Sequence, residues 1–137
     1  MQTPQVRILI ADDHALFAEA LTIALMGDEE LAVVGIARDG LEAVALTEDL
    51  RPDVVLMDVH MPLIDGVEAT RRIRDIVPRT RVVMLTSDDS SIVQNAALEA
   101  GASCFLTKTC GAAELLDAVH HAATRAVWPF TRALGAA

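Results

Sequence analysis

Five side chains that could bind phosphate or a metal ion follow short apolar runs of the sequence. Asp12 and Asp13 come directly after the first run, and Asp58 comes after the third. Thr86 ends the fourth run, and Lys108 follows the fifth. In open parallel α/β sheets, ligands bind at the edge where the carboxyl ends of the strands meet. We therefore expect these five residues to lie together at one edge of a sheet.

Three carboxylates at one edge repel one another and require a nearby positive charge. Two unit charges about 4 Å apart interact by about 4 kcal/mol at an effective dielectric constant of about 20. Lys108 supplies one positive charge, and clustered carboxylate oxygens are also the ligands that Mg²⁺ prefers. We predict a Mg²⁺ site that would stabilise the charge on a transferring phosphoryl group, and a carboxylate there can form an aspartyl phosphate.

The segments that must position these side chains alternate between two patterns. Short, nearly continuous apolar runs predict five strands that are buried on both faces: Val6–Ala11, Ala32–Ala37, Val54–Met57, Val82–Leu85 and Ser103–Thr107. Segments with apolar residues at i, i+3 and i+4 predict five helices: Ala15–Met26, Gly40–Leu50, Gly66–Ile76, Ser90–Ala100 and Ala112–Thr124. This alternation indicates an α/β fold with helices on both faces of a parallel sheet.

Two segments around the polar residues resemble the receiver domains of two-component response regulators. Val55–Gly66 (VLMDVHMPLIDG) resembles the family signature D-x-x-M-P-x-x-D-G, and Gly101–Lys108 (GASCFLTK) resembles its G-A-x-x-[FY]-L-x-K segment. The resemblance extends from Val6 to about Thr124. Further motifs are similar to those of NarL/LuxR-type members: Asp12-Asp13-His14, Leu16-Phe17, Val33-Val34-Gly35 and Arg51-Pro52-Asp53.

The resemblance implies a fold and a phosphoacceptor. The fold would be flavodoxin-like, a doubly wound five-stranded parallel sheet of strand order 2-1-3-4-5 with five helices. Asp58 would accept the phosphoryl group, and Thr86 and Lys108 would bind it and assist its transfer. Many receivers carry proline after this lysine, whereas Thr109 stands here. The isomer of the Lys108–Thr109 peptide bond is therefore left open.

The resemblance also implies a metal site and a switch. Asp13 and Asp58 would bind Mg²⁺ directly, Asp12 through water, and His60 through its backbone carbonyl. Phosphorylation would draw Thr86 inward, and Phe105 would turn into the vacated space. Taken singly, these residues also have structural interpretations as helix caps, strand ends or core.

The implied partner is a sensor histidine kinase, and a homodimer is plausible. The domain would be a phosphoacceptor that assists its own phosphotransfer and dephosphorylation. Its output would be transcription through a helix-turn-helix domain. Residues 1–124 would form the receiver, and 125–137 an extension or the start of a linker. Either the effector domain was removed or the receiver acts alone, and the chain's continuation past the last helix favours removal.

Composition narrows the classes of partner. The formal net charge of -9 repels a phosphate backbone, so direct DNA binding is not expected. No apolar run approaches the roughly 18 residues that span a bilayer, and the N-terminus has no secretory pattern. We therefore expect a cytoplasmic protein without a membrane partner.

Other functions can be compared with the same residues. A phosphatase of the haloacid-dehalogenase type would carry D-x-D on its first strand, whereas Asp12 and Asp13 are adjacent and Asp58 follows the third strand. A pseudo-receiver that serves only as a docking module would be expected to lack Asp58, Thr86 or Lys108, and all three are present. The four histidines are not expected to carry phosphate, and His60 and Asp88 are expected to tune hydrolysis of the aspartyl phosphate.

Overall fold

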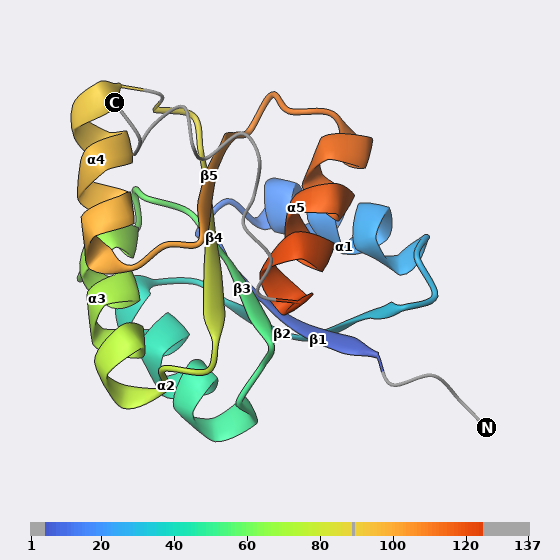
Figure 1. Cartoon of the computed structure of the whole chain (residues 1–137), viewed down its shortest axis with the longest axis horizontal. Coiled ribbons are helices and arrows are strands. Elements are labelled where there is room, and N and C mark those ends of the chain that lie inside the picture. The colour runs from blue at the N-terminus through green and yellow to red at the C-terminus, as the bar shows by residue number, and fades with distance from the viewer. Residues whose placement is uncertain (1–4, 89, 125–137) are drawn as a thin grey trace.

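The computed structural model describes residues 5–88 and 90–124, in which strands and helices alternate (Figure 1). The strands are β1 (Val6–Ala11), β2 (Leu31–Ala37), β3 (Val54–Met57), β4 (Arg81–Thr86) and β5 (Cys104–Thr107). The helices are α1 (Ala15–Met26), α2 (Gly40–Leu50), α3 (Gly66–Ile76), α4 (Ser91–Ala100) and α5 (Ala112–Thr124). Each predicted element is present, with bounds that agree to within one residue.

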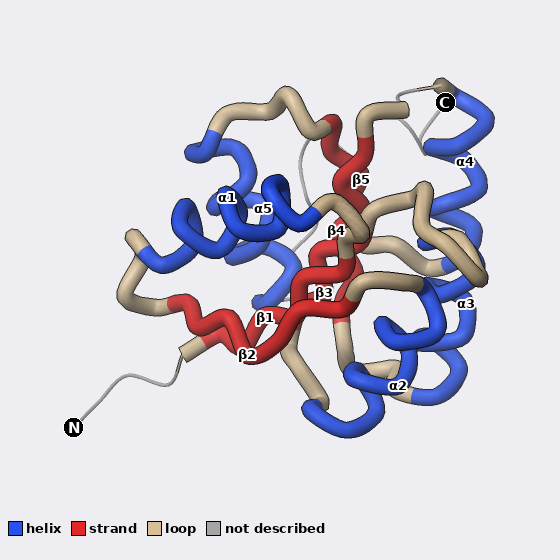
Figure 2. The backbone as a smooth tube through the Cα atoms, turned by 180° about the vertical axis from the view of Figure 1, so that it is seen from behind, coloured by secondary structure: helices blue, strands red, loops and turns tan. Residues whose placement is uncertain are grey.

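The five strands form one parallel sheet in the order β2-β1-β3-β4-β5, which confirms the predicted fold class. Helices α1 and α5 cover one face, and α2, α3 and α4 cover the other (Figures 1 and 2). The strand order reverses next to β1, which pairs with β2 on one side and β3 on the other. Ligands bind at such a switch point, beyond the carboxyl ends of the strands.

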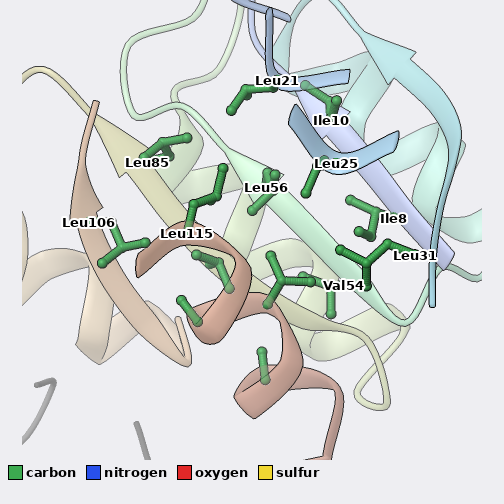
Figure 3. Close-up of a cluster of buried hydrophobic side chains, with 14 of the residues drawn as sticks. Ile8, Ile10, Leu21, Leu25, Leu31, Val54, Leu56, Leu85, Leu106 and Leu115 are labelled. Carbon is green, nitrogen blue, oxygen red and sulfur yellow. The ribbon is translucent and has the colours of Figure 1, made fainter. Parts of the chain in front are cut away.

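Successive residues of β1 contribute to two hydrophobic clusters, one on each face of the sheet. Ile8 and Ile10 pack with Leu25 of α1 and Leu115 of α5 (Figure 3). Leu9, between them, belongs to the cluster under α2, α3 and α4. Fully burying one such side chain stabilises the fold by roughly 1.5–3 kcal/mol. The sheet is therefore a rigid base for residues at its carboxyl edge.

Strand β2 differs from the prediction that every strand is buried on both faces. Its end residues, Leu31 and Ala37, are buried, but the five residues between them are only half-buried. The reason is its position, because β2 is an edge strand that pairs with β1 alone. An apolar run indicates a strand but does not say whether that strand lies at the edge of the sheet.

The helix starts show which aspartates are caps. Asp39 and Asp65 accept hydrogen bonds from the backbone of α2 and α3, at 2.7 and 2.8 Å, and so act as N-caps. Asp12 and Asp13 do not cap α1, whose N-cap residue is His14, without a side-chain cap bond. The acidic pair is therefore left available for another role.

No helix within the described ranges is long and apolar enough to cross a membrane. The predicted C-terminal extension or linker, residues 125–137, lies outside the described residues.

Candidate functional site

The carboxyl edge of the sheet brings the predicted residues together, because the sheet's hydrogen bonding continues past the strand ends. The Asp58 amide donates to the carbonyl of Ala11 at 2.9 Å. The Lys108 amide donates to the carbonyl of Thr86 at 2.8 Å, and the Asp12 amide binds the end of β2 at 3.0 Å. These residues are therefore positioned by the backbone of the sheet rather than by mobile loops.

Gly66 allows α3 to start against the backbone of Asp58. Its amide donates to the carbonyl of Val59 at 2.7 Å. A Cβ atom at this position would overlap the carbonyl oxygen of Asp58, a contact that real side chains do not make. Only glycine fits there without displacing the Asp58 backbone, which gives a physical reason for the glycine that ends the VLMDVHMPLIDG segment.

Lys108 joins the two buried carboxylates of the site. Its Nζ lies 2.8 Å from Asp12 Oδ2 and 3.3 Å from Asp58 Oδ2. Both aspartates are almost fully buried, at 2% and 4% exposure. The ammonium group also lies 4.5 Å from the centroid of the Phe17 ring, a cation–π contact that helps to hold it over the site. The lysine thus supplies the predicted counter-charge.

The environment of Asp58 disfavours its ionised form. Burial raises the pKa of its carboxyl group, and the neighbouring Asp12 raises it further. Lys108 and the backbone amide of His60 act in the opposite direction without cancelling the rise. The ionised form of Asp58 is therefore disfavoured in the folded protein, and an additional cation at the site would stabilise it.

This raised pKa leads to a prediction about stability. A carboxyl group whose pKa is higher in the folded than in the unfolded protein does not destabilise the fold at pH values below its unfolded pKa of 3.8. The cost in stability grows as pH rises from there through the folded pKa, and is complete above it. We expect Asp58→Asn to remove this cost, so that the metal-free variant melts at a higher temperature than the wild type at pH 7.

Thermal melts in EDTA from pH 3 to 8 would test this. The difference in Tm between variant and wild type should shrink toward low pH, where both carry a neutral side chain. Asp49→Asn is a matched control, because Asp49 is exposed on α2. A wild type that melts at or above the temperature of Asp58→Asn at pH 7 would contradict the pKa direction.

Four residues present possible metal ligands in one place. Ligand atoms of Asp12, Asp13, His14 and Asp58 all lie within 4.8 Å of one another. Three of them are the predicted carboxylates, and this set of oxygens fits a hard divalent cation. His14 was not predicted as a site residue, because its sequence context indicated only a NarL/LuxR-type motif and a phosphoryl-carrying role was not expected for any histidine. Its place directly after the acidic pair was the available signal.

His60 and Asp88 lie beside the site, as predicted. His60 Nε2 and Asp88 Oδ2 are 3.2 Å apart, and this pair joins the loop after β3 to the loop after β4. The His60 amide lies 3.4 Å from Asp58 Oδ1, at the long end of hydrogen-bond distances. The predicted metal contact through the His60 carbonyl stays a prediction.

Thr86 and Phe105 occupy the predicted switch positions at the ends of β4 and β5. The Thr86 hydroxyl is fully buried and accepts a hydrogen bond from the Asp88 amide at 3.1 Å. Phe105 is only 7% exposed and packs in the cluster under α2, α3 and α4. The Lys108–Thr109 peptide bond, left open above, is trans, because the described chain has no cis peptide.

The other two histidines, His120 and His121 of α5, make their hydrogen bonds away from this edge of the sheet. His120 of α5 places Nε2 2.8 Å from Asp28 Oδ2, in the loop after α1. A hydrogen bond from His120 lowers the pKa of Asp28. This contact is a tie between α5 and the α1–β2 loop and gives no support for a phosphoryl-carrying role.

Comparison with known proteins identifies the family. Residues 8–120 match the response regulator receiver domain. The chain belongs to that family. Its relatives include the transcriptional regulatory protein LnrK of Bacillus subtilis, 41% identical over 83% of this chain and 52% of the relative. A solved LuxR-family two-component response regulator from Aurantimonas superimposes with a TM-score of 0.87 at 32% identity, covering 96% of this chain and 94% of that one.

The predicted NarL/LuxR-type resemblance and the flavodoxin-like receiver fold are thereby confirmed. The match also removes the phosphatase alternative as the family of this chain. The chain spans about half the length of the first relatives that it matches. It is also 46% identical to 32% of the length of a Myxococcus xanthus protein-glutamate methylesterase, with 81% of this chain covered. Receivers of this kind therefore occur in proteins with different outputs.

Proposed function

We propose that this receiver domain accepts a phosphoryl group on Asp58 from a phosphohistidine of a sensor histidine kinase. The observation that carries the proposal is the placement of the Asp58 carboxylate. It lies buried at a strand end, 3.3 Å from Lys108 Nζ and beside Asp12 and Asp13. This arrangement provides a nucleophile, a fixed cation and oxygen ligands for Mg²⁺ in one place.

In the proposed reaction, an oxygen of Asp58 attacks phosphorus as the bond from phosphorus to the histidine nitrogen breaks. Lys108 offsets the negative charge that develops on the phosphoryl oxygens, and Thr86 would donate a hydrogen bond to one of them. Asp12, Asp13 and Asp58, with the His60 carbonyl, would hold Mg²⁺. When bound, the ion supplies further neutralisation of that charge.

The proposed switch couples this charge to Thr86 and Phe105. An aspartyl phosphate introduces about -1.5 to -2 charges and new acceptor oxygens, by analogy with other phosphorylated side chains. The Thr86 hydroxyl now accepts a hydrogen bond from the Asp88 amide, and it would be drawn inward to donate its own hydrogen to one of these oxygens. Phe105 is already only 7% exposed in this structure, so we expect phosphorylation to hold the ring in this buried position against a more exposed one. Reversing a 1:99 population requires about 5.5 kcal/mol of differential stabilisation.

The output would be transcription control through a DNA-binding domain outside these residues, with residues 125–137 as an extension or linker. The related transcriptional regulatory proteins support this reading. The same proposal places the protein in the cytoplasm, as a signalling domain rather than an enzyme, and allows a homodimer.

Intact mass after incubation with acetyl phosphate and Mg²⁺ would test the proposal. The expected result is a gain of one phosphoryl group that EDTA prevents. Failure to gain phosphate under any condition would favour the docking-module alternative, in which the fold is kept and the chemistry is absent.

The His60–Asp88 pair leads to a prediction about the lifetime of the phosphorylated state. Because the pair bridges two loops beside Asp58, we expect it to restrict the approach of water. The two side chains are 61% and 35% exposed, so solvent screens their interaction and the expected effect on the lifetime is modest. His60→Asn should therefore shorten the lifetime by a factor of up to about five.

Loss of phosphate can be followed by mass after removal of the donor. Asp88→Asn should shorten the lifetime similarly, and His121→Asn, on α5, should leave it unchanged. Lifetimes of both site variants equal to the wild type would exclude this role for the pair.

A further inference from the structure

The ring of His14 lies among the three carboxylates of the proposed metal site. Its Nδ1 is 3.1 Å from Asp12 Oδ1, 3.3 Å from Asp13 Oδ1 and 3.8 Å from Asp58 Oδ2. The sequence suggested no role for this side chain, and the phosphoryl-transfer chemistry does not require it. The ring therefore calls for a separate interpretation.

These distances match the spacing of donors around one metal ion. Two donor atoms that each lie about 2.1 Å from an ion, at right angles, are about 3.0 Å apart. The separation of Nδ1 from Asp13, an expected direct ligand, is close to that value, and the separation from Asp58, the other expected direct ligand, exceeds it by less than 1 Å. A small movement of the ring, which is 65% exposed, would complete the set.

The local backbone holds His14 in this place. His14 is the N-cap residue of α1, in an extended conformation (φ -88°, ψ 100°). Its amide donates to Asp12 Oδ1 at 2.8 Å, so the residue is tied to the carboxylate that its ring approaches. Lys108 binds the other oxygen of Asp12, Oδ2, at 2.8 Å. Lysine and imidazole therefore approach different oxygens of the same carboxylate.

We propose that His14 is a metal ligand through Nδ1, and that it makes this site selective for divalent ions that favour nitrogen. The inference rests on the proposed function, because it takes the same carboxylates as the metal site. Carboxylate oxygens suit Mg²⁺. An imidazole nitrogen favours transition-metal ions, and its contribution to affinity is larger for Co²⁺ than for Mn²⁺, in the Irving–Williams order. With His14 as ligand, the site binds Co²⁺ more tightly relative to Mg²⁺ than an oxygen-only site would.

The test is to measure the affinities of the full chain for Mg²⁺ and Co²⁺ by isothermal titration calorimetry, for the wild type and His14→Ala. We expect the variant to lose at least about tenfold in Co²⁺ affinity, a typical effect of disturbing a metal site, while Mg²⁺ affinity changes much less. The visible absorption of bound Co²⁺ should also change, since it reports the loss of a nitrogen ligand. His121→Ala, which removes an imidazole on α5, is the matched control and should behave as the wild type.

Three outcomes would overturn the proposal. Equal losses for both ions would mean that His14 only supports the carboxylates. Tighter binding of both ions by His14→Ala would mean that the imidazole competes with the ion for the carboxylates. An unchanged Co²⁺ affinity and spectrum would mean that the ring does not touch the ion.

Phosphorylation of the same samples separates this inference from the proposed function. A variant that gains phosphate with Mg²⁺ but shows no selective loss of Co²⁺ contradicts the role of His14 alone. A wild type that shows the selectivity but gains no phosphate contradicts the phosphoacceptor function and leaves the metal assignment in place.

Discussion

Asp58→Asn should abolish phosphoryl uptake from acetyl phosphate, the largest effect that we expect from any single substitution. The amide has nearly the shape of the carboxylate but is a far weaker nucleophile, so no stable acyl phosphate can form. The fold should survive, because the variant removes a buried carboxylate whose pKa is already raised by burial and by Asp12. Intact mass in Mg²⁺ should show the unmodified protein alone.

Two controls make this result specific. Asp49→Asn, an exposed change on α2, should gain one phosphoryl group as the wild type does. Asp13→Asn should be phosphorylated more slowly, because it weakens the proposed metal site while the nucleophile stays. If Asp58→Asn still gained a phosphoryl group that requires Mg²⁺, another side chain of the cluster would be the acceptor.

The elements and the central residues of the site could be predicted from the sequence. Continuous apolar runs such as Val54–Met57 identify buried strands, and in a parallel sheet their carboxyl ends share one edge. Asp12, Asp58 and Lys108 follow such runs directly. Their meeting is therefore a consequence of topology, and it needs no knowledge of side-chain conformation.

What could not be predicted depends on packing and on side-chain direction. The partial exposure of β2 follows from its edge position, which the apolar pattern does not encode. The approach of His14 to three carboxylates depends on the extended backbone at the start of α1. The bond between the Thr86 hydroxyl and the Asp88 amide depends on the turn after β4. Each of these features is set by local three-dimensional geometry, which residue types and their spacing do not determine.

Lys108→Ala should slow phosphorylation strongly without removing the acceptor. The lysine is the fixed cation of the site, with Nζ at 3.3 Å from Asp58 Oδ2 of the proposed nucleophile. Removing one preorganised group that stabilises transition-state charge typically costs between about 100-fold and 1000-fold in rate. The variant should therefore gain the same single phosphoryl group as the wild type, but at a rate lower by about that factor.

The same substitution removes the ammonium group between two buried carboxylates, Asp12 and Asp58, so a slow rate must be separated from a lost fold. Circular dichroism would show whether the variant is folded. The rates should be compared at saturating Mg²⁺, because a bound divalent ion would offset part of the carboxylate repulsion. Lys108→Arg is the matched variant: it keeps the positive charge, but its planar guanidinium cannot reproduce the compact ammonium group. We expect its rate to fall between those of the wild type and Lys108→Ala. A folded Lys108→Ala that is phosphorylated at the wild-type rate would show that the metal ion alone neutralises the transferring group, and that the lysine only maintains the buried carboxylates.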